Sequence, residues 1–516
     1  MLIKSNIRRI TRRPNHIPFI LCLLAILCVR CANPTMPVWH EEPHAPPAGL
    51  AYDYRLRLPT MHPDSLSVTL TVRGQASTPI SLVLPFVYAD NPVDSMTGPI
   101  VPEFSVSDAD GNEVHTFIET RWIGPAQSKI LTVPAGLSYP LTLTYRPKVN
   151  RVKNLDGDSS LPSVFLTERE GFLLGSHLFA VPYESTLPAL WRTRRTIKLT
   201  VELGENISIA GVPIGTTYYS NAYALLFVQP SFDTELLTTG NGGGLSYEFH
   251  SFSGYRPPSQ ILQRTANDFA VILDSLIPIY GALGGMQTYP VFFRNEWGGL
   301  EGTHSFTCFY PDFRSRGIVA MVLAHELIHD AVGIQCGDYD DPWWKEGVTN
   351  YLGWASATRL GLAEKEECYE DLIGIYDSSI FVARYAPSSR ALRYNIFTDG
   401  VAVAYGKGAQ IAMCMDLAVR RATGNTRRLD ETIAALCRAY EHGAFTQNQM
   451  VAHFRAYTGA DIAPILTEYA DKAGAIPQTV LDSTFTTLDS LGAFGQKSMK
   501  KHRYLERIPP GEWIKR

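Results

Sequence analysis

The sequence predicts a multi-domain protein of the β then α/β kind, in which an antiparallel β-sandwich domain precedes a mainly α-helical domain. Its 516 residues exceed what one ordinary hydrophobic core holds, so two or three domains are expected. Apolar residues recur at every second position between about residues 50 and 245, which is typical of strands. After the glycine-rich segment 240–244 the apolar period becomes helical. We therefore expect a β domain over 50–245 and a helical domain over 246–475.

The first 31 residues have the character of a signal peptide. Basic residues between positions 4 and 13 precede an apolar stretch, 17–29, which is too short to span a bilayer comfortably. A buried or interfacial helix is the alternative. Neither Cys28 nor Cys31 follows the small residue that is usual before a lipid-bearing cysteine, so lipid attachment and plain cleavage both stay open. We expect an exported protein that is periplasmic, associated with the cell surface or outer membrane, or secreted.

The next segment, 32–49, is rich in proline and is expected to form an extended linker. The chain as a whole carries a formal net charge of −4 and shows no basic stripe beyond the signal region. This composition argues against a nucleic-acid partner. A membrane contact is expected only through an N-terminal lipid anchor, and the oligomeric state stays open.

Three stretches of alternating apolar residues support the β domain, at 66–72, 141–145 and 197–203. Turn sequences such as Asp110-Gly111-Asn112 separate them. Strands with one apolar face must bury it against a second layer, so we interpret the region as an antiparallel sandwich.

The helical domain begins with an apolar helix face over 261–276, followed by a short strand over 289–293. Helices continue to about residue 475, and one of them starts at the capping box formed by Thr446 and Gln449. Residues 476–516 are expected to be a loosely packed extension with a basic end. Cys414 and Cys437 lie in apolar helical patterns and are expected to be core thiols. Any pairing among the five cysteines beyond the signal peptide stays open, and their odd number leaves at least one unpaired within the chain: Cys308, Cys336, Cys368, Cys414 and Cys437.

The most informative motif is His325-Glu326-Leu327-Ile328-His329, inside an apolar segment expected to be helical over 316–332 and to stop at Gly333. Histidines four positions apart share one face of a helix, so both can reach one metal ion. Glu326, between them, can reach a water bound to that metal. Two unliganded histidines and a carboxylate in a buried helix would be costly to desolvate, which argues against a chance match.

Glu346 is the expected third ligand. Asp341 and Pro342 are typical of a helix start, and they place Glu346 in the second turn of a helix running through Leu360. An antiparallel helix pair would then aim Glu346 at the two histidines. Three protein ligands with one open position are typical of catalytic rather than structural zinc. We therefore expect one Zn²⁺ per chain at His325, His329 and Glu346.

Two further segments offer groups for a substrate. Gly298 and Gly299 follow a strand and allow another backbone to approach closely, and Glu301 can pair with a free α-ammonium group. Tyr405 opens an apolar helix, and a protonated tyrosine can donate a hydrogen bond to a developing oxyanion. On spacing alone, a glycine turn with a solvated glutamate and a simply packed tyrosine stay open as alternatives.

The ordered set of motifs resembles the gluzincin zinc metallopeptidases, most closely the glycyl aminopeptidase family and more distantly aminopeptidase N. The matching motifs are Gly-Gly-Leu-Glu at 298–301, His-Glu-x-x-His at 325–329, Trp-x-x-Glu-Gly at 343–347 and Tyr-x-Lys-Gly-Ala at 405–409. The resemblance is specific from about 287 to 469 and weak over the β domain. Members commonly carry a C-terminal PDZ domain, whereas only 41 residues follow position 475 here.

This resemblance implies a thermolysin-like zinc peptidase domain and an exported aminopeptidase that removes N-terminal residues, glycine or alanine by preference, from peptides. A zinc endopeptidase is the enzymatic alternative. A non-catalytic surface binding protein on a peptidase scaffold is the other, which the intact motifs disfavour. The implied residues are His325, His329 and Glu346 for zinc, Glu326 as general base and then general acid, Tyr405 for the oxyanion, Gly298, Gly299 and Glu301 for the substrate, and Asn350 as a second contact of a zinc-bound histidine.

Overall fold

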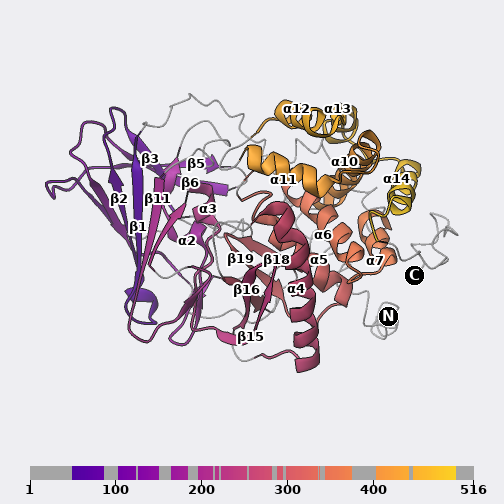
Figure 1. Ribbon diagram of the computed structural model, residues 1–516. Helices are drawn as coiled ribbons and strands as arrows, with labels where there is room; N and C mark the ends of the chain where they lie inside the picture. The colour runs from indigo at the N-terminus through magenta and orange to yellow at the C-terminus, as the bar shows by residue number, and fades with distance from the viewer. Residues whose placement is uncertain are drawn as a thin grey trace, which may run out of the picture.

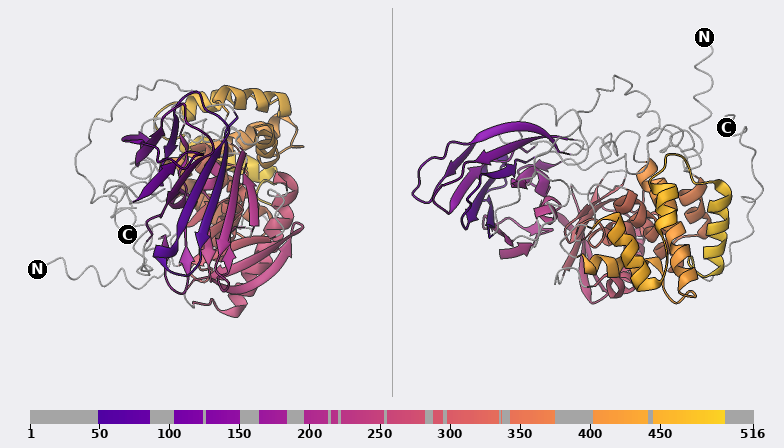
Figure 2. Two further views of the ribbon diagram at one scale, coloured as in Figure 1. Left: turned by 90° about the vertical axis from the view of Figure 1, so that its left-hand side faces the viewer. Right: turned by 90° about the horizontal axis from the view of Figure 1, so that it is seen from above.

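The computed structural model describes residues 49–85, 103–123, 126–149, 164–183, 196–212, 215–219, 222–252, 255–281, 288–294, 298–334, 336, 343–374, 402–440 and 445–495. Strands dominate the N-terminal part and helices the C-terminal part, and the two lie side by side (Figures 1 and 2). The predicted signal peptide and almost all of the predicted linker lie outside the described residues. Within them, no helix is long and apolar enough to cross a membrane.

The largest sheet has six strands in the order β13-β11-β1-β2-β7-β4. Its central pairs, β1 with β2 and β2 with β7, are antiparallel, but β1 and β11 run parallel. The expectation of a purely antiparallel sheet is therefore wrong for this pair. Parallel neighbours need a long crossover, and the chain between β1 and β11 supplies one. The strands are β1 (Ala51–Leu58), β2 (Ser67–Arg73), β4 (Phe104–Ser107), β7 (Leu141–Tyr145), β11 (Thr196–Leu203) and β13 (Gly215–Tyr219).

Two four-stranded sheets complete the N-terminal part. One has the order β10-β3-β6-β5 and the other β12-β14-β9-β8. Their strands are β3 (Ile80–Val83), β5 (Phe117–Ile123), β6 (Ala126–Val133), β8 (Phe165–Leu166), β9 (Gly171–Phe172), β10 (Val181–Tyr183), β12 (Ile209–Ala210) and β14 (Ser231–Phe232). A 3₁₀ turn, η2 (Pro63–Ser65), and two short helices, α2 (Gly175–Leu178) and α3 (Ala222–Leu226), accompany them.

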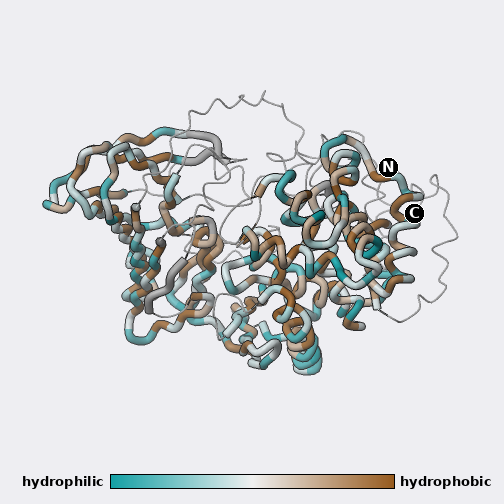
Figure 3. Tube along the Cα trace, turned by 45° about the horizontal axis from the view of Figure 1, so that its top comes forward, coloured by the Kyte–Doolittle hydropathy of each residue, from teal (hydrophilic) through white to brown (hydrophobic). Residues whose placement is uncertain are grey.

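The period of two in the sequence gives these strands one buried face. In β1 and β2 the side chains of Leu56 and Leu70 are fully buried while their neighbours are not. Hydrophilic and hydrophobic segments alternate along this part of the chain (Figure 3). The hydroxyl of Tyr54 donates to the carbonyl of Ala180 at 2.7 Å, and one apolar cluster links residues of β1, β2, β3, β6 and β7.

A five-stranded mixed sheet leads into the helical part, in the order β15-β16-β17-β19-β18. Its strands are β15 (Glu235–Gly242), β16 (Leu245–Ser251), β17 (Thr288–Arg294), β18 (Gly299–Gly302) and β19 (Ser305–Phe309). Helix α4 (Ser259–Tyr280) packs on it, and the ring of Phe269 lies 5.2 Å from that of Tyr247. The predicted boundary after residue 245 falls within the β15–β16 hairpin, whose strands belong to this sheet.

Helical segments make up the rest. The predicted capping box forms, with Thr446 Oγ1 accepting from the Gln449 amide at 3.3 Å. All five described cysteines are buried and free, which confirms Cys414 and Cys437 as core thiols. The segments are α5 (Arg316–His329), η4 (Trp343–Gly347), α6 (Val348–Arg359), α7 (Lys365–Tyr369), η5 (Glu370–Gly374), η8 (Ala402–Lys407), α10 (Gly408–Ala422), α11 (Leu429–Ala439), α12 (Gln447–Thr458), α13 (Ala463–Ile465), η9 (Leu466–Ala470) and α14 (Gln478–Ser490).

The segment after residue 475 departs from expectation. Helix α14 presents Leu481, Phe485 and Leu488 to the core, and the ring of Phe485 stacks on Phe494 with centroids 4.4 Å apart. The expected loose packing is therefore wrong for residues 476–495, because this apolar helix face needs a partner and finds one. Residues 496–516 lie outside the described part of the chain.

Candidate active site

Helix α5 carries the His-Glu-x-x-His motif on its last turns. The side chain of Ser315 caps it by accepting from the Ile318 amide at 3.3 Å. The helix ends at His329, slightly before the expected end, and Gly333 follows with a φ of +104°. His325, Glu326 and His329 are all buried. The motif thus brings two imidazoles and a carboxyl group into the protein interior.

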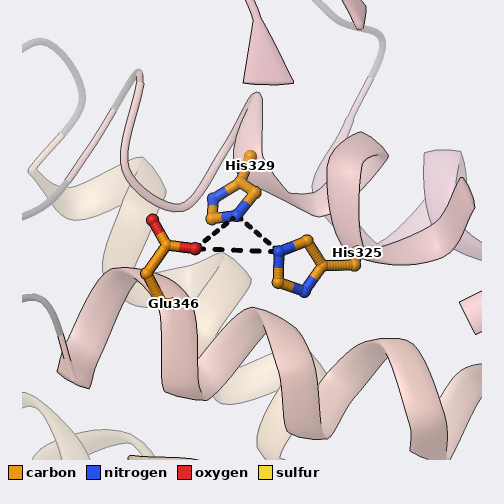
Figure 4. Close-up of side chains that lie close together, drawn as sticks. All are labelled: His325, His329 and Glu346. Carbon is orange, nitrogen blue, oxygen red and sulfur yellow. Dashed lines mark hydrogen bonds and ion pairs between the residues drawn. The ribbon is translucent and has the colours of Figure 1, made fainter. Parts of the chain in front are cut away.

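Three ligand atoms converge at this point (Figure 4). The Nε2 atoms of His325 and His329 lie 2.9 Å apart, and Glu346 Oε2 lies 3.3 Å from His329 Nε2 and 3.7 Å from His325 Nε2. Ligand atoms around a tetrahedral zinc ion, at bond lengths near 2 Å, are separated by about 3.4 Å. The observed triangle has this size, so the predicted ligands fit one zinc ion.

The protonation of these groups suits metal binding. Burial lowers the pKa of His325, aided by the nearby His329, which favours the neutral imidazole that coordinates metals. Burial alone would raise the pKa of Glu346. The ammonium group of Lys345 outweighs it, followed by His329 and the hydrogen bonds from His325 and His329, so that the pKa lies well below its usual range. Glu346 is therefore a carboxylate at neutral pH.

The residues that contact the predicted ligand His329 differ from the one predicted from the sequence. His329 Nδ1 lies 3.1 Å from the carbonyl oxygen of Val332, which fixes the ring so that Nε2 faces Glu346. Thr349 Oγ1 lies 3.3 Å from His329 Nε2. The side chain of Asn350 instead donates to the carbonyl of Tyr405 at 3.4 Å and hydrogen-bonds Asp371. Asn350 thus supports the segment that carries Tyr405, and its expected histidine contact is not among these bonds.

Close backbone packing positions Glu346. It lies on the η4 turn that leads into α6, and the next residue, Gly347, lies against Gly408 at the start of α10. A Cβ at Gly408 would lie 2.9 Å from Gly347 Cα, so neither position has room for a side chain. On α6, a Cβ at Gly353 would lie 3.0 Å from the Met321 carbonyl oxygen and 3.3 Å from His325 Cβ. The sequence motifs contained Gly347 and Gly408 but did not reveal this role.

Strand β18 runs beside the motif helix. A Cβ at Gly299 would lie 2.6 Å from Cδ of Glu326, so glycine is what lets this strand lie against the Glu326 carboxyl group. Gly298 has open space on its side-chain face. Two residues on, Glu301 is buried, and its carboxylate lies within 4.8 Å of ligand atoms of Glu326 and His329. The predicted substrate residues are therefore assembled next to the predicted metal ligands.

One residue in this assembly was missed at the sequence level. The ammonium group of Lys345 forms an ion pair with Glu301 and lies 3.4 Å from Glu346 Oε1. A lysine directly before a predicted zinc ligand, in a buried aromatic turn, was the signal that could have revealed it. The strand that carries Glu301 is held in turn by Gln229, whose amide donates to the carbonyls of Leu300 and Glu301 at 3.0 Å each.

Tyr405 reaches the site from η8. Its ring lies almost parallel to that of His325, with centroids 6.0 Å apart, and its hydroxyl is hydrogen-bonded to Glu346. Burial, followed by the negative charges of Glu346 and Glu301, raises the pKa of Tyr405 well above its ordinary value. The hydroxyl therefore keeps its proton and can donate it in a hydrogen bond.

Comparison with known proteins gives a likeness in structure. Neither models of protein families nor curated proteins match the sequence. An aminopeptidase N family protein from Idiomarina loihiensis aligns with a TM-score of 0.59 and 17% identity, over 84% of this chain and 78% of that one. Leukotriene A4 hydrolase from Saccharomyces cerevisiae aligns with a TM-score of 0.57 and 17% identity, over 86% and 72%. The same yeast enzyme in complex with bestatin aligns with a TM-score of 0.57 and 14% identity, over 88% and 72%. This chain shares the fold of these proteins.

Proposed function

We propose that this protein is a zinc-dependent aminopeptidase. The observation that carries the proposal is the triangle of ligand atoms from His325, His329 and Glu346, with Glu326 inside the same buried assembly. The shared fold with an aminopeptidase N family protein and leukotriene A4 hydrolase supports it. One zinc ion would be held by the three ligands.

Bound zinc lowers the pKa of a coordinated water and polarises a carbonyl group. Glu326 then acts as general base, taking a proton from the attacking water and delivering it to the leaving amine. Tyr405 donates its hydroxyl hydrogen bond to the oxyanion that develops on the scissile carbonyl. The raised pKa of Tyr405 keeps that donor available at neutral pH.

Glu301 makes the enzyme act at the end of a peptide. Its buried carboxylate binds the α-ammonium group of the first residue, and this fixes the first peptide bond beside Glu326. The backbone at Gly298 and Gly299 lies alongside the substrate. The side-chain face of Gly298 is open, and Gly299 lets the Glu326 carboxyl group lie against this backbone.

The test is hydrolysis of a panel of aminoacyl reporter substrates, which includes the glycyl and alanyl compounds that the resemblance implies. Cleavage should require zinc, stop with a chelator and return when zinc is added. Bestatin, present in the complex of the yeast enzyme, should inhibit it. A zinc-loaded protein that cleaves none of the reporters would contradict the proposal.

An endopeptidase is the second candidate, because the Glu301 carboxylate already pairs with Lys345 and is not simply waiting for an ammonium group. Comparing each peptide with its N-acetylated form separates the two. An aminopeptidase cleaves the free form much faster, whereas an endopeptidase cleaves both at similar rates.

We propose in addition that the protein is exported, on the basis of the basic and apolar pattern of residues 1–31. The intact mass of the mature protein tests this. A mass that includes residues 1–27 would contradict removal of the signal, and a mass increment at Cys28 or Cys31 would distinguish lipid attachment from plain cleavage.

A further inference from the structure

A partly buried aspartate is linked to the turn that carries Tyr405. Asp371 lies on η5, and its carboxylate accepts a hydrogen bond from Trp354 Nε1 at 2.6 Å. The side chain of Asn350 makes a second hydrogen bond to it. Asn350 and Trp354 are one turn apart on α6, so a single carboxylate holds two side chains on the same face of that helix.

The charge of Asp371 determines how the amide group of Asn350 is oriented. Desolvation raises the pKa of Asp371 to about 6, against hydrogen bonds from Trp354 and Asn350 that favour the charged form. At pH 7.5 the group is therefore mainly a carboxylate, which accepts hydrogen bonds and donates none, so it pairs with the NH2 end of the amide. That NH2 group has a second hydrogen, and Asn350 Nδ2 donates to the Tyr405 carbonyl at 3.4 Å.

The turn that receives this hydrogen bond is held on both sides of Tyr405. A Cβ at Gly347 would lie 2.8 Å from the carbonyl oxygen of Ala404, so the backbone before Tyr405 lies directly against the segment that carries the predicted metal ligand. After it, the ammonium group of Lys407 donates to the Lys472 carbonyl at 2.8 Å. The amide donor described above acts between these two contacts, on Tyr405 itself.

We infer that Asp371 is a positioning residue for Tyr405 and that it acts through Asn350. The carboxylate keeps the amide NH2 group turned toward the Tyr405 carbonyl, and the fixed backbone then keeps the tyrosine hydroxyl beside Glu346, where it is hydrogen-bonded. The inference rests on the proposed aminopeptidase function, in which that hydroxyl donates to the oxyanion. A displaced donor stabilises the oxyanion less, so the effect should fall on kcat.

Two substitutions at Asp371 separate its role as an acceptor from its size. Asp371→Asn keeps a side-chain oxygen that can accept from both Trp354 and Asn350, whereas Asp371→Leu has a similar size and cannot accept. With zinc-loaded protein and an aminoacyl reporter at pH 7.5, Asp371→Leu should lower kcat by about tenfold with KM nearly unchanged. Asp371→Asn should retain most of the kcat. A kcat in Asp371→Leu equal to that of the unaltered protein would overturn the inference.

A double-mutant cycle assigns the loss to Tyr405. In Tyr405→Phe protein no hydroxyl is left to position, so the addition of Asp371→Leu should not lower kcat further. A purely structural role predicts the same proportional fall in both backgrounds, and that result would overturn the inference. If Asp371→Leu does not fold, Asn350→Ala takes its place in the cycle, because it removes the connecting amide and leaves the bond between Asp371 and Trp354 intact.

A spectroscopic measurement separates this inference from the proposed activity. Fluorotyrosine incorporated in place of Tyr405 alone reports by fluorine NMR on the surroundings of that ring, without hydrolysis. Asp371→Leu should shift this signal. The matched control is Asp430→Asn, which changes a buried carboxylate that pairs with Arg359 at the far end of α6, and it should leave the signal unchanged.

This pattern of shifts supports the inference even if no reporter is cleaved, in which case only the proposed activity fails. An equal shift in Asp371→Leu and Asp430→Asn, or no shift in Asp371→Leu, overturns the inference whatever the reporters show.

Discussion

The two parts of the molecule bury different kinds of side chain. Among the described residues between 49 and 234, no aspartate, glutamate, lysine, arginine or histidine is buried, and the core is mainly aliphatic and aromatic, with the uncharged polar side chains of Ser176, Gln229 and Ser231. Beyond residue 234, buried acidic, basic and histidine side chains gather, many of them around α5 and η4. They are His250, Asp268, Arg294, Glu301, His325, Glu326, His329, Asp330, Lys345, Glu346, Lys365, Lys407, Asp416, Arg420 and Asp430.

This difference indicates that the N-terminal core serves stability and that the helical part also serves the chemistry of the candidate site. Burying a charge costs free energy unless a partner or a metal compensates it, so a core assembled for stability alone leaves charges outside. The N-terminal part follows that rule. The helical part departs from it most strongly where Glu301, Lys345 and Glu346 meet the two histidines. Substitutions in the two parts should therefore separate activity from stability.

Glu326→Gln should have the largest effect, and this effect should be on activity alone. The variant keeps the shape of the side chain but cannot accept the proton of the attacking water, so kcat should fall by about 10³-fold. Metal analysis should find zinc retained, and the midpoint of thermal unfolding should not fall. Full activity in this variant would remove Glu326 from the mechanism.

Leu70→Ala, in the N-terminal part, should have the opposite result: a loss of stability without a loss of activity. Leu70 is fully buried on β2, and its truncation should lower the free energy of unfolding by about 3 kcal/mol. At a temperature where the variant stays folded, kcat should match that of the unaltered protein. Urea unfolding measures the first effect and reporter hydrolysis the second.

The matched control is Thr69→Ala, one position earlier on the same strand and only partly buried. It should change the free energy of unfolding by less than about 1 kcal/mol. A loss of kcat in Leu70→Ala, at full folding, would mean that the N-terminal core also tunes the catalytic geometry.

These two parts also differ in how far the sequence predicts them. Along β1 and β2 a residue's face follows from its position in the period of two, which is why Leu56 and Leu70 were identifiable as core. The parallel pairing of β1 with β11 was not predictable, because strand order depends on contacts between distant segments. The same holds for α14, which was expected to be loosely packed. Its apolar face needs a partner, but the partner comes from contacts that the local sequence does not show.

Within the candidate site, the closeness of His325 and His329 was predictable because helix geometry alone places them on one face. Gly299 and Tyr405 were recognisable from their motifs, and the structure brings both next to the histidines and Glu326. The Lys345–Glu301 pair was not, since it joins two segments 44 positions apart through side chains that each look solvated in isolation.

Tyr405→Phe tests a second side chain of the candidate active site. It removes one hydroxyl and keeps the ring that stacks on His325, so what is lost is the hydrogen bonding of that hydroxyl, to Glu346 in this structure and to the oxyanion in the proposed reaction. We expect kcat to fall by about 10²-fold with KM nearly unchanged. An effect on KM alone would contradict the oxyanion role.

Tyr351→Phe is a suitable control for that variant. Tyr351 is also buried in the helical part, and its hydroxyl donates to Asp416 at 2.6 Å on α10. Its loss should lower the free energy of unfolding by about 1 to 2 kcal/mol and leave kcat unchanged. Equal losses of kcat in the two tyrosine variants would indicate a general effect of burial rather than catalysis by Tyr405.

The smallest expected effect concerns the stability of the N-terminal part and its dependence on pH, through His177. Burial lowers the pKa of His177, on α2, to about 4. The ring is therefore neutral in the folded protein at pH values where the unfolded chain, with a pKa near 6.5, binds a proton. Between about pH 6.5 and pH 4 the unfolded state binds more protons, so stability falls as the pH falls.

A fully sealed ring with this pKa would lose about 3 kcal/mol over that range, but His177 is partly exposed and about 1 kcal/mol is more realistic. Urea unfolding at pH 7.5 and pH 5 measures the loss, and His177→Gln should reduce it, because glutamine cannot take up the proton. The difference between the two proteins isolates His177 from the other histidines. If the two proteins lose the same stability on acidification, the neutral ring of His177 contributes nothing to the acid sensitivity of the fold.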